Sequence, residues 1–326
     1  MRYRKLTGLI GMLLLAALLC GCSDQAPLPA GGSNPVPANG NASVTVAVTR
    51  DSGKVILLEE TVAIEEGSTA LDALHQVAEV RTKYGGGFVD AINGISSEYE
   101  GGKQKKDWLF YINGISPSIG ADDYIIRDGN IEHWDFRDWS YQQYIPAIIG
   151  DFPQPFLGGY RGEVWPTVIV HDAGLEEYAR ALAERLHELG VAEVAAWEYS
   201  QLSQAEKEKD NLIMLGTKDN ELIAELNAAH KKLGFYAYFN EDKLVVLNAQ
   251  GEVAAGYGAG SGLIQATQNP WHPKGVGTGE NVVWMVSGVD EAGVRNAADT
   301  LLNGYADLKY AYAVAVAEGM VIRVPP

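Results

Sequence analysis

The sequence predicts an α+β domain followed by an α/β three-layer domain, both carried behind a disordered N-terminal tether. Three observations predict this arrangement. Alternating apolar residues, Asn-Gly turns and one helical segment occupy residues 43–137. Longer apolar runs alternate with helical segments over residues 166–326. Residues 22–42 are rich in Pro, Gly, Ala and Asn, and they contain little apolar material that could order them.

The first 22 residues have the pattern of an export signal. Basic residues Arg2, Arg4 and Lys5 precede an apolar run over residues 6–19. That run is shorter than the roughly 20 apolar residues needed to span a bilayer. The segment Leu19-Cys20-Gly21-Cys22 resembles the lipobox of bacterial lipoproteins, in which a diacylglyceryl group is attached to the final cysteine.

This resemblance implies that residues 1–21 are a cleaved signal peptide and that Cys22 is lipidated. The protein is then exported and lipid-anchored to the outer face of the cytoplasmic membrane, with membrane lipid as its first partner. Stable anchoring takes at least two acyl chains, which a diacylglyceryl group supplies. An uncleaved signal anchor is the alternative, and the shortness of the apolar run disfavours it.

Composition excludes two further features. The formal net charge of −17 repels phosphate backbones, so nucleic acid is not an expected partner. The only cysteines of the sequence are Cys20 and Cys22, so the mature protein contains no disulfide. Both domains must therefore be stabilised by ordinary cores, for which a hydrophobic content of 47% provides the material.

The first domain begins with an alternating strand and contains one helix. Valines alternate over residues 44–48 and give that strand one apolar face. Ser68 is suited to cap the helix that follows it. Asn-Gly pairs at residues 93–94 and 113–114 end later strands, because they tolerate positive φ. The expected elements are strands over residues 43–48, 55–64, 88–92, 108–112 and 131–136, and a helix over residues 70–78.

The second domain alternates strands of buried type with helices, which predicts a parallel-rich sheet between helical layers. Residues 138–165, which are aromatic and rich in Pro and Gly, are expected to be a connector that packs on one domain. The expected elements are strands over residues 167–171, 191–197, 212–215, 243–247 and 282–287, and helices over residues 175–189, 220–233, 263–268 and 291–302.

Four blocks of the first domain agree in order and spacing with a known unit. They are residues 87–95, 107–114, 120–124 and 128–134. They resemble the transcobalamin-like C-terminal (DUF4430) domain, a β-grasp unit that also occurs in bacterial surface lipoproteins. The resemblance implies a β-grasp fold and ligand binding, since in transcobalamin and intrinsic factor this domain covers one face of the corrin. It does not imply that the ligand here is cobalamin, because the large helical domain of those proteins is absent.

The second domain is similar to non-catalytic α/β domains of bacterial surface proteins and of exported accessory subunits of polysaccharide assembly. Residues 215–220, 269–271 and 286–293 carry this similarity. It implies a fold rather than an activity.

Aromatic residues of the first domain are the candidate ligand contacts. Trp108 and Phe110 share one face of their strand, and Tyr111 points to the other. One face must be core, and the other can present aromatic area to a flat ligand. His133 is a candidate axial ligand to a tetrapyrrole metal or else a surface histidine. The candidate ligand-binding residues are Trp108, Phe110, Tyr111, His133 and Trp134, and their alternative role is that of core residues.

No catalytic residue and no metal site are predicted. The glycine-rich residues 256–262 do not fit the dinucleotide or phosphate-binding patterns, and Ser261 is not in a nucleophile elbow. The six histidines are scattered without metal-ligand spacing. We therefore expect a protein that is not an enzyme, with cobalamin as a candidate ligand rather than an assigned cofactor.

The leading hypothesis is a cell-surface lipoprotein that binds or presents a ligand through its β-grasp domain. A corrinoid or another tetrapyrrole is the candidate ligand, and a membrane importer is the candidate partner. The second hypothesis is a structural or adhesion protein of the cell envelope that contacts polysaccharide or a surface protein. Its candidate sugar-stacking residues are Trp139, Tyr141, Tyr144, Trp165 and Trp271. The third hypothesis is an exported hydrolase without a recognisable motif.

Overall fold

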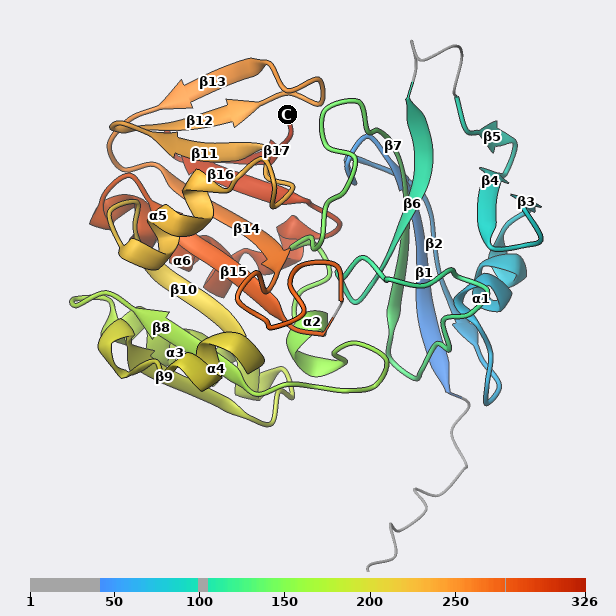
Figure 1. The fold of residues 1–326 in the computed structure, drawn as a ribbon, viewed down its shortest axis with the longest axis horizontal. Helices are drawn as coiled ribbons and strands as arrows, with labels where there is room; N and C mark the ends of the chain where they lie inside the picture. Colours follow the sequence, from blue (N-terminus) through green and yellow to red (C-terminus); the bar gives the residue numbers. More distant parts are fainter. Residues whose placement is uncertain (1–41, 99–104, 279) are drawn as a thin grey trace, which may run out of the picture. The chain divides into compact units, whose positions relative to one another are not determined.

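The computed structural model describes residues 42–98, 105–278 and 280–326. The predicted signal peptide, Cys22 and the predicted tether up to residue 41 lie outside the described residues. The structure is a mixed α+β fold that is rich in strands, as the sequence predicts (Figure 1). None of its described helices is both long and apolar enough to cross a membrane.

The first sheet has four strands in the order β2-β1-β7-β6. Strand β1 is antiparallel to β2 and parallel to β7, which in turn is antiparallel to β6. The valines that alternate along β1 are buried, so the predicted apolar face is confirmed. The strands are β1 (Ser43–Arg50), β2 (Val55–Ala63), β6 (Lys106–Ile112) and β7 (Ile131–Asp138).

One helix and a small sheet cover one face of these strands. Helix α1 (Ala70–Val77) is capped by Thr69 rather than by the expected Ser68, because the Thr69 side chain accepts from the backbone N–H of Asp72. The Asp72 carboxylate accepts in return from the Thr69 N–H, which completes a capping box. The small sheet consists of β3 (Val80–Lys83), β4 (Phe88–Ile92) and β5 (Ile95–Ser96).

The second large sheet has seven strands in the order β17-β16-β14-β15-β10-β8-β9. Strands β15, β10, β8 and β9 are parallel, whereas β14, β16 and β17 join antiparallel. The strands are β8 (Thr167–His171), β9 (Val194–Glu198), β10 (Asn211–Thr217), β14 (Gly262–Gln268), β15 (Val282–Gly288), β16 (Ala313–Ala317) and β17 (Met320–Val324).

Both faces of this sheet are covered, which gives three layers. Helices α3 (Glu176–Glu188) and α6 (Glu291–Asn303) pack with Ile169, Ile213 and Trp284 on one face. Helix α5 (Glu221–Ala228) and a three-stranded sheet pack with the alternate residues on the other face. That smaller sheet consists of β11 (Ala237–Asn240), β12 (Lys243–Leu247) and β13 (Val253–Tyr257). Short helices α2 (Gln154–Leu157) and α4 (Gln204–Lys209) and two 3₁₀ turns, Tyr199–Gln201 and Tyr305–Leu308, complete the fold.

Two predicted helices differ from the structure. Residues 263–268 are strand β14 and not a helix, and all of its residues are buried. The residues Ile264 to Thr267 alternate apolar and polar side chains as a strand does, and the buried Gln265 and Thr267 show that its polar face is covered as well. The helix predicted over residues 220–233 ends at Ala228. The Asn227 side chain near its end exchanges two hydrogen bonds with the backbone of Phe239, and so connects this end to strand β11.

Candidate functional site

Two of the predicted ligand contacts on strand β6 lie in the core beneath helix α1. Trp108 is 6% exposed, and its Nε1 donates to the backbone oxygen of Ile95 at 2.9 Å. Phe110 stacks on Trp134, with ring centroids 4.8 Å apart and planes 16° apart. All three aromatic residues belong to the core cluster that contains the buried residues of α1 and β4.

The other face of the same strands is covered by the C-terminal part of the chain. Tyr111 packs edge-on against Tyr312 with centroids 5.6 Å apart, and His133 lies 4.8 Å from the ring of Tyr310. His133 is fully buried, which differs from the expectation of a surface histidine. The five predicted contact residues therefore present no open aromatic face to a flat ligand, because the sheet is covered on both sides.

A buried polar cluster lies on this second face. The Thr49 hydroxyl lies 2.7 Å from His133 Nε2 and donates to Asp135 Oδ1 at 2.7 Å. A hydroxyl has one proton, so Nε2–H of His133 must be the donor to Thr49, which leaves Nδ1 unprotonated. This Nδ1 faces Asp151 Oδ1 at 3.8 Å. Tyr312 Oη donates to Asp135 Oδ2 at 2.9 Å.

Burial changes the protonation of this cluster. Desolvation lowers the pKa of His133 to about 3, and it raises the pKa of Asp151 to about 7. On the opposite face of β7, Glu132 Oε1 accepts from Trp134 Nε1, and burial raises the pKa of Glu132 to about 8. The cavity that Tyr312 lines has a volume of about 10 Å³, which is far too small for a substrate. The cluster therefore joins the first sheet to the rest of the fold rather than forming a binding site.

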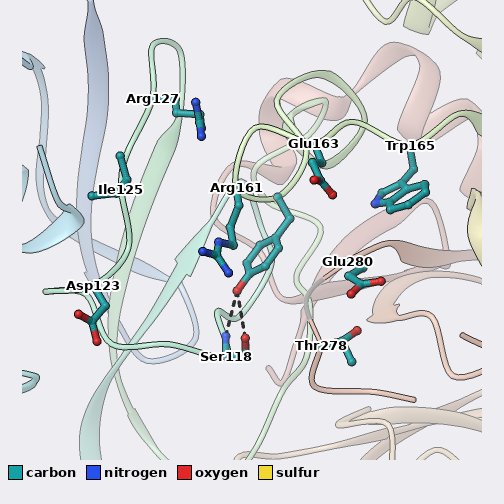
Figure 2. Close-up of a pocket in the computed structure, with 10 residues that line it drawn as sticks. Ser118, Asp123, Ile125, Arg127, Arg161, Glu163, Trp165, Thr278 and Glu280 are labelled. Carbon is teal, nitrogen blue, oxygen red and sulfur yellow. Dashed lines mark hydrogen bonds between the residues drawn. The ribbon is translucent and has the colours of Figure 1, made fainter. Parts of the chain in front are cut away.

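A larger pocket of about 460 Å³ lies where three segments of the chain meet (Figure 2). The loop between β6 and β7, the segment between α2 and β8, and the loop between β14 and β15 form its walls. The lining residues are Ser118, Asp123, Ile125 and Arg127, then Tyr160, Arg161, Glu163 and Trp165, and finally Thr278 and Glu280.

One wall of the pocket is a tight turn. Tyr160 and Glu163 exchange two backbone hydrogen bonds of 3.0 Å across Arg161 and Gly162. Both central residues have positive φ, +55° for Arg161 and +83° for Gly162, as in a type I′ turn. Asn, Asp or Gly is favoured at the first central position of such turns, and an arginine there is strained. We infer that the backbone of the turn does not require an arginine at this position, and that Arg161 is present because of its side chain.

Two tyrosines attach this turn to the loop that precedes β7. Tyr160 Oη accepts from the backbone N–H of Ser118 at 3.1 Å, as the dashed lines in Figure 2 show. The backbone N–H of Arg161 donates to Tyr124 Oη at 2.9 Å. The two rings pack edge to face, with centroids 5.6 Å apart. These contacts fix Arg161 relative to the loop that carries Arg127.

Arg127 lies directly over the turn. A Cβ placed on Gly162 would come within 2.5 Å of Arg127 Nε and 2.8 Å of its Cζ, so a side chain there would displace the Arg127 guanidinium from this position. Arg127 and Arg161 are 34 positions apart in the sequence, and both line this pocket. Neither Arg127 nor Arg161 forms an ion pair within residues 42–98, 105–278 and 280–326.

The remaining polar groups of the pocket differ in the ion pairs and hydrogen bonds that they form. Glu280 is held by His272, 2.7 Å away, and by Lys274. Asp123 and Glu163 are exposed and, within the described part of the chain, form no ion pair. Trp165 Nε1 is buried without a hydrogen-bond acceptor. The pocket thus offers two free guanidinium groups, two free carboxylates and one free indole N–H.

The sequence analysis named Trp165 but neither arginine. Nothing in a single sequence distinguishes Arg127 or Arg161 from other surface arginines, and only the fold brings them together. The one available signal was the Arg-Gly pair at residues 161–162 in a segment rich in turn residues. No group of three or more potential metal-ligating side chains occurs in the described ranges.

Comparison with known proteins agrees with the expected first domain. The model of a family described as a domain of unknown function, DUF4430, matches residues 67–138, which confirms the predicted DUF4430 domain. A crystal structure of a protein from Ruminococcus gnavus ATCC 29149, proposed to bind metal, matches with a TM-score of 0.23 and 15% identity. That match covers 30% of this chain and 97% of the other.

Haptocorrin in complex with Cbi matches with a TM-score of 0.24 and 16% identity. The match covers 30% of this chain and 26% of the haptocorrin chain, so this chain spans only a minor part of that protein. A search of the curated proteins finds no match.

Proposed function

We propose that this protein is a lipid-anchored cell-surface binding protein that holds its ligand in the pocket around Arg127 and Arg161. The pocket itself is the observation that carries the proposal. Its volume of about 460 Å³ lies in the range of roughly 300–1,000 Å³ that is usual for ligand sites. Its walls come from the DUF4430 domain, the connector and the α/β domain, so one ligand would contact all three.

Binding is better supported than catalysis. His133, the histidine among the predicted contact residues, is fully buried and contacts Thr49 away from any substrate-sized cavity. The pocket itself contains carboxylates, guanidinium groups and hydroxyls but no histidine or cysteine in its lining. General base catalysis needs a group of suitable pKa within hydrogen-bond reach of the substrate. We therefore propose that the protein is not an enzyme.

The export signal supports a location outside the cell, with Cys22 carrying the lipid. In this location the protein would capture a ligand and pass it to a membrane importer. Replacement of Cys22 with serine should abolish incorporation of radiolabelled palmitate and release the protein from the membrane fraction. Unchanged labelling and fractionation of the variant would contradict lipidation at this residue.

A corrinoid or another tetrapyrrole remains the first candidate ligand by resemblance. The aromatic residues expected to contact it are buried, so such a ligand would have to bind at the mouth of the pocket instead. Thermal denaturation with cobalamin, haem and a panel of small organic acids and sugars tests the proposal. A ligand at 100 times its Kd stabilises a protein by about 2.7 kcal/mol, which is readily measured.

The proposal predicts that at least one compound raises the melting temperature and that an Arg161→Asn variant loses this increase. Asparagine tolerates positive φ, so the turn should persist in the variant. The proposal fails if no compound stabilises the protein, or if stabilisation is the same in the variant.

A second function is contact with envelope polysaccharide. It is favoured by Trp165, which is one of the sugar-stacking candidates from the sequence and lines the pocket. Trp271 adds an indole ring with Lys207 Nζ 5.2 Å from its centroid. Retention of the protein on purified cell-wall glycan, compared with the Trp165→Leu variant, tests this function.

A further inference from the structure

We infer that the pocket binds a sugar acid, with the carboxylate of a hexuronate contacting Arg127 and Arg161 and the sugar ring lying against Trp165. This inference rests on the proposed function and specifies the chemical class of the ligand.

The two arginines favour a ligand that carries a carboxylate. A guanidinium group presents parallel N–H donors that match the two oxygens of a carboxylate, and such charge-assisted bonds are stronger than neutral ones. The protein has 42 acidic and 25 basic residues, yet neither Arg127 nor Arg161 is paired with a described carboxylate. Arg161 is held at a strained φ of +55°, and Arg127 is accommodated by the absence of a side chain at Gly162.

The free carboxylates of the pocket further restrict the chemical class of the ligand. Asp123 and Glu163 line the same pocket, and they would repel a phosphate dianion more strongly than a carboxylate monoanion. Each carboxylate accepts hydrogen bonds only, so a matching ligand carries several O–H donors in addition to its negative charge. A polyhydroxylated monoanion meets both requirements.

Trp165 offers the surface against which the sugar ring of the ligand would lie. Figure 2 shows Trp165 on the opposite side of the pocket from Arg127 and Arg161, with Glu163 between them in this view. Its indole offers a flat apolar surface, and its Nε1–H is buried without an acceptor. A pocket of about 460 Å³ suits a mono- or disaccharide better than a whole corrin ring.

Isothermal titration of the purified full chain in detergent micelles with galacturonate and galactose tests the inference. These sugars differ only in a carboxylate in place of a hydroxymethyl group. We expect galacturonate to bind at least about tenfold more tightly, since a charge-assisted pair contributes that much or more. The Arg161→Asn and Arg127→Gln variants should each weaken galacturonate binding at least about tenfold.

The matched control is Arg180→Gln, which removes one exposed arginine of helix α3 outside the pocket and should leave the affinity unchanged. Melting curves of all variants check that the fold persists. Binding to polygalacturonate as well as to the monomer would identify an envelope glycan as the source of the sugar acid. Binding to the monomer alone would identify a free sugar.

Four outcomes overturn the inference. Equal affinity for galactose and galacturonate would show that the arginines do not recognise the carboxylate of the sugar. Tighter competition by inorganic phosphate would show a general anion site. If neither sugar binds but another compound stabilises the protein in an Arg161-dependent way, the sugar-acid inference fails while the proposed function stands. If no compound binds, both fail.

Discussion

Replacement of Asp151 with asparagine should make the stability of the protein less sensitive to a rise in pH from 4 to 8. Asp151 is fully buried beside His133, and burial raises the pKa of its carboxyl from 3.8 to about 7. The folded protein therefore holds this proton more tightly than the unfolded chain does. Stability that is fully present below pH 3.8 is lost progressively as the pH rises towards 7.

The size of the effect follows from this pKa difference. One pKa unit corresponds to about 1.4 kcal/mol, so a carboxyl that titrates near 7 instead of 3.8 costs about 4 kcal/mol above neutral pH. Asparagine has the same shape and remains neutral at every pH. The free energy of unfolding of Asp151→Asn relative to the wild type should therefore rise by about 2–4 kcal/mol between pH 4 and pH 8.

Urea denaturation followed by tryptophan fluorescence, repeated at each pH unit from 4 to 8, measures this difference. Taking the difference between the two proteins cancels the titration of Glu132 and His133, whose shifted pKa values they share. Asp242→Asn, at a carboxylate that is 93% exposed, controls for the loss of one negative charge from an acidic protein. A difference between wild type and Asp151→Asn that stays constant across this range would refute the reasoning.

Three further predictions concern stability, each measured by the urea midpoint. Thr69→Ala removes the capping box of helix α1 and should cost about 1 kcal/mol, whereas Ser68→Ala should cost little. Tyr312→Phe removes the hydroxyl that donates to the buried Asp135 and should cost about 1–3 kcal/mol; an unchanged midpoint would argue against a structural role for this bond. Gly150→Ala places a Cβ 2.3 Å from the backbone of Tyr310 and Ala311 and should cost about 1–3 kcal/mol, while Gly258→Ala, which meets no neighbouring atom, should be nearly neutral.

The coverage of the first sheet explains why a DUF4430 domain alone does not present a ligand face here. Strands β6 and β7 are covered on both faces, an aromatic face beneath α1 and a face with the buried polar residues His133 and Asp135 beneath Tyr310 and Tyr312. Exposing the second face would leave the Asp135 and His133 cluster without its Tyr312 donor and its Asp151 neighbour. The polar groups of this cluster make separation of the two parts costly, which favours the pocket over the strand face as the place of binding.

Local patterns in the sequence determined most of the elements. The alternation along β1, the helical spacing of α3 and α6, and the continuous apolar run of β10 arise from residues within one segment, so they are readable without the fold. The four spaced blocks likewise predicted the DUF4430 domain that the family match confirms. Strand β14 was predicted as a helix, because a segment of only 7 residues is too short for its periodicity to distinguish a strand from a helix.

The candidate site was decided only by tertiary structure. Tyr111 and Tyr312 are in contact although about 200 positions separate them, and this contact decides that one predicted ligand face is buried. Arg127 and Arg161 are unremarkable as single residues, and they line one pocket only because Tyr124 and Tyr160 join their segments. A residue's own neighbours along the chain determine its periodicity and turn preference, whereas its burial and its charge partners depend on segments that only folding brings together.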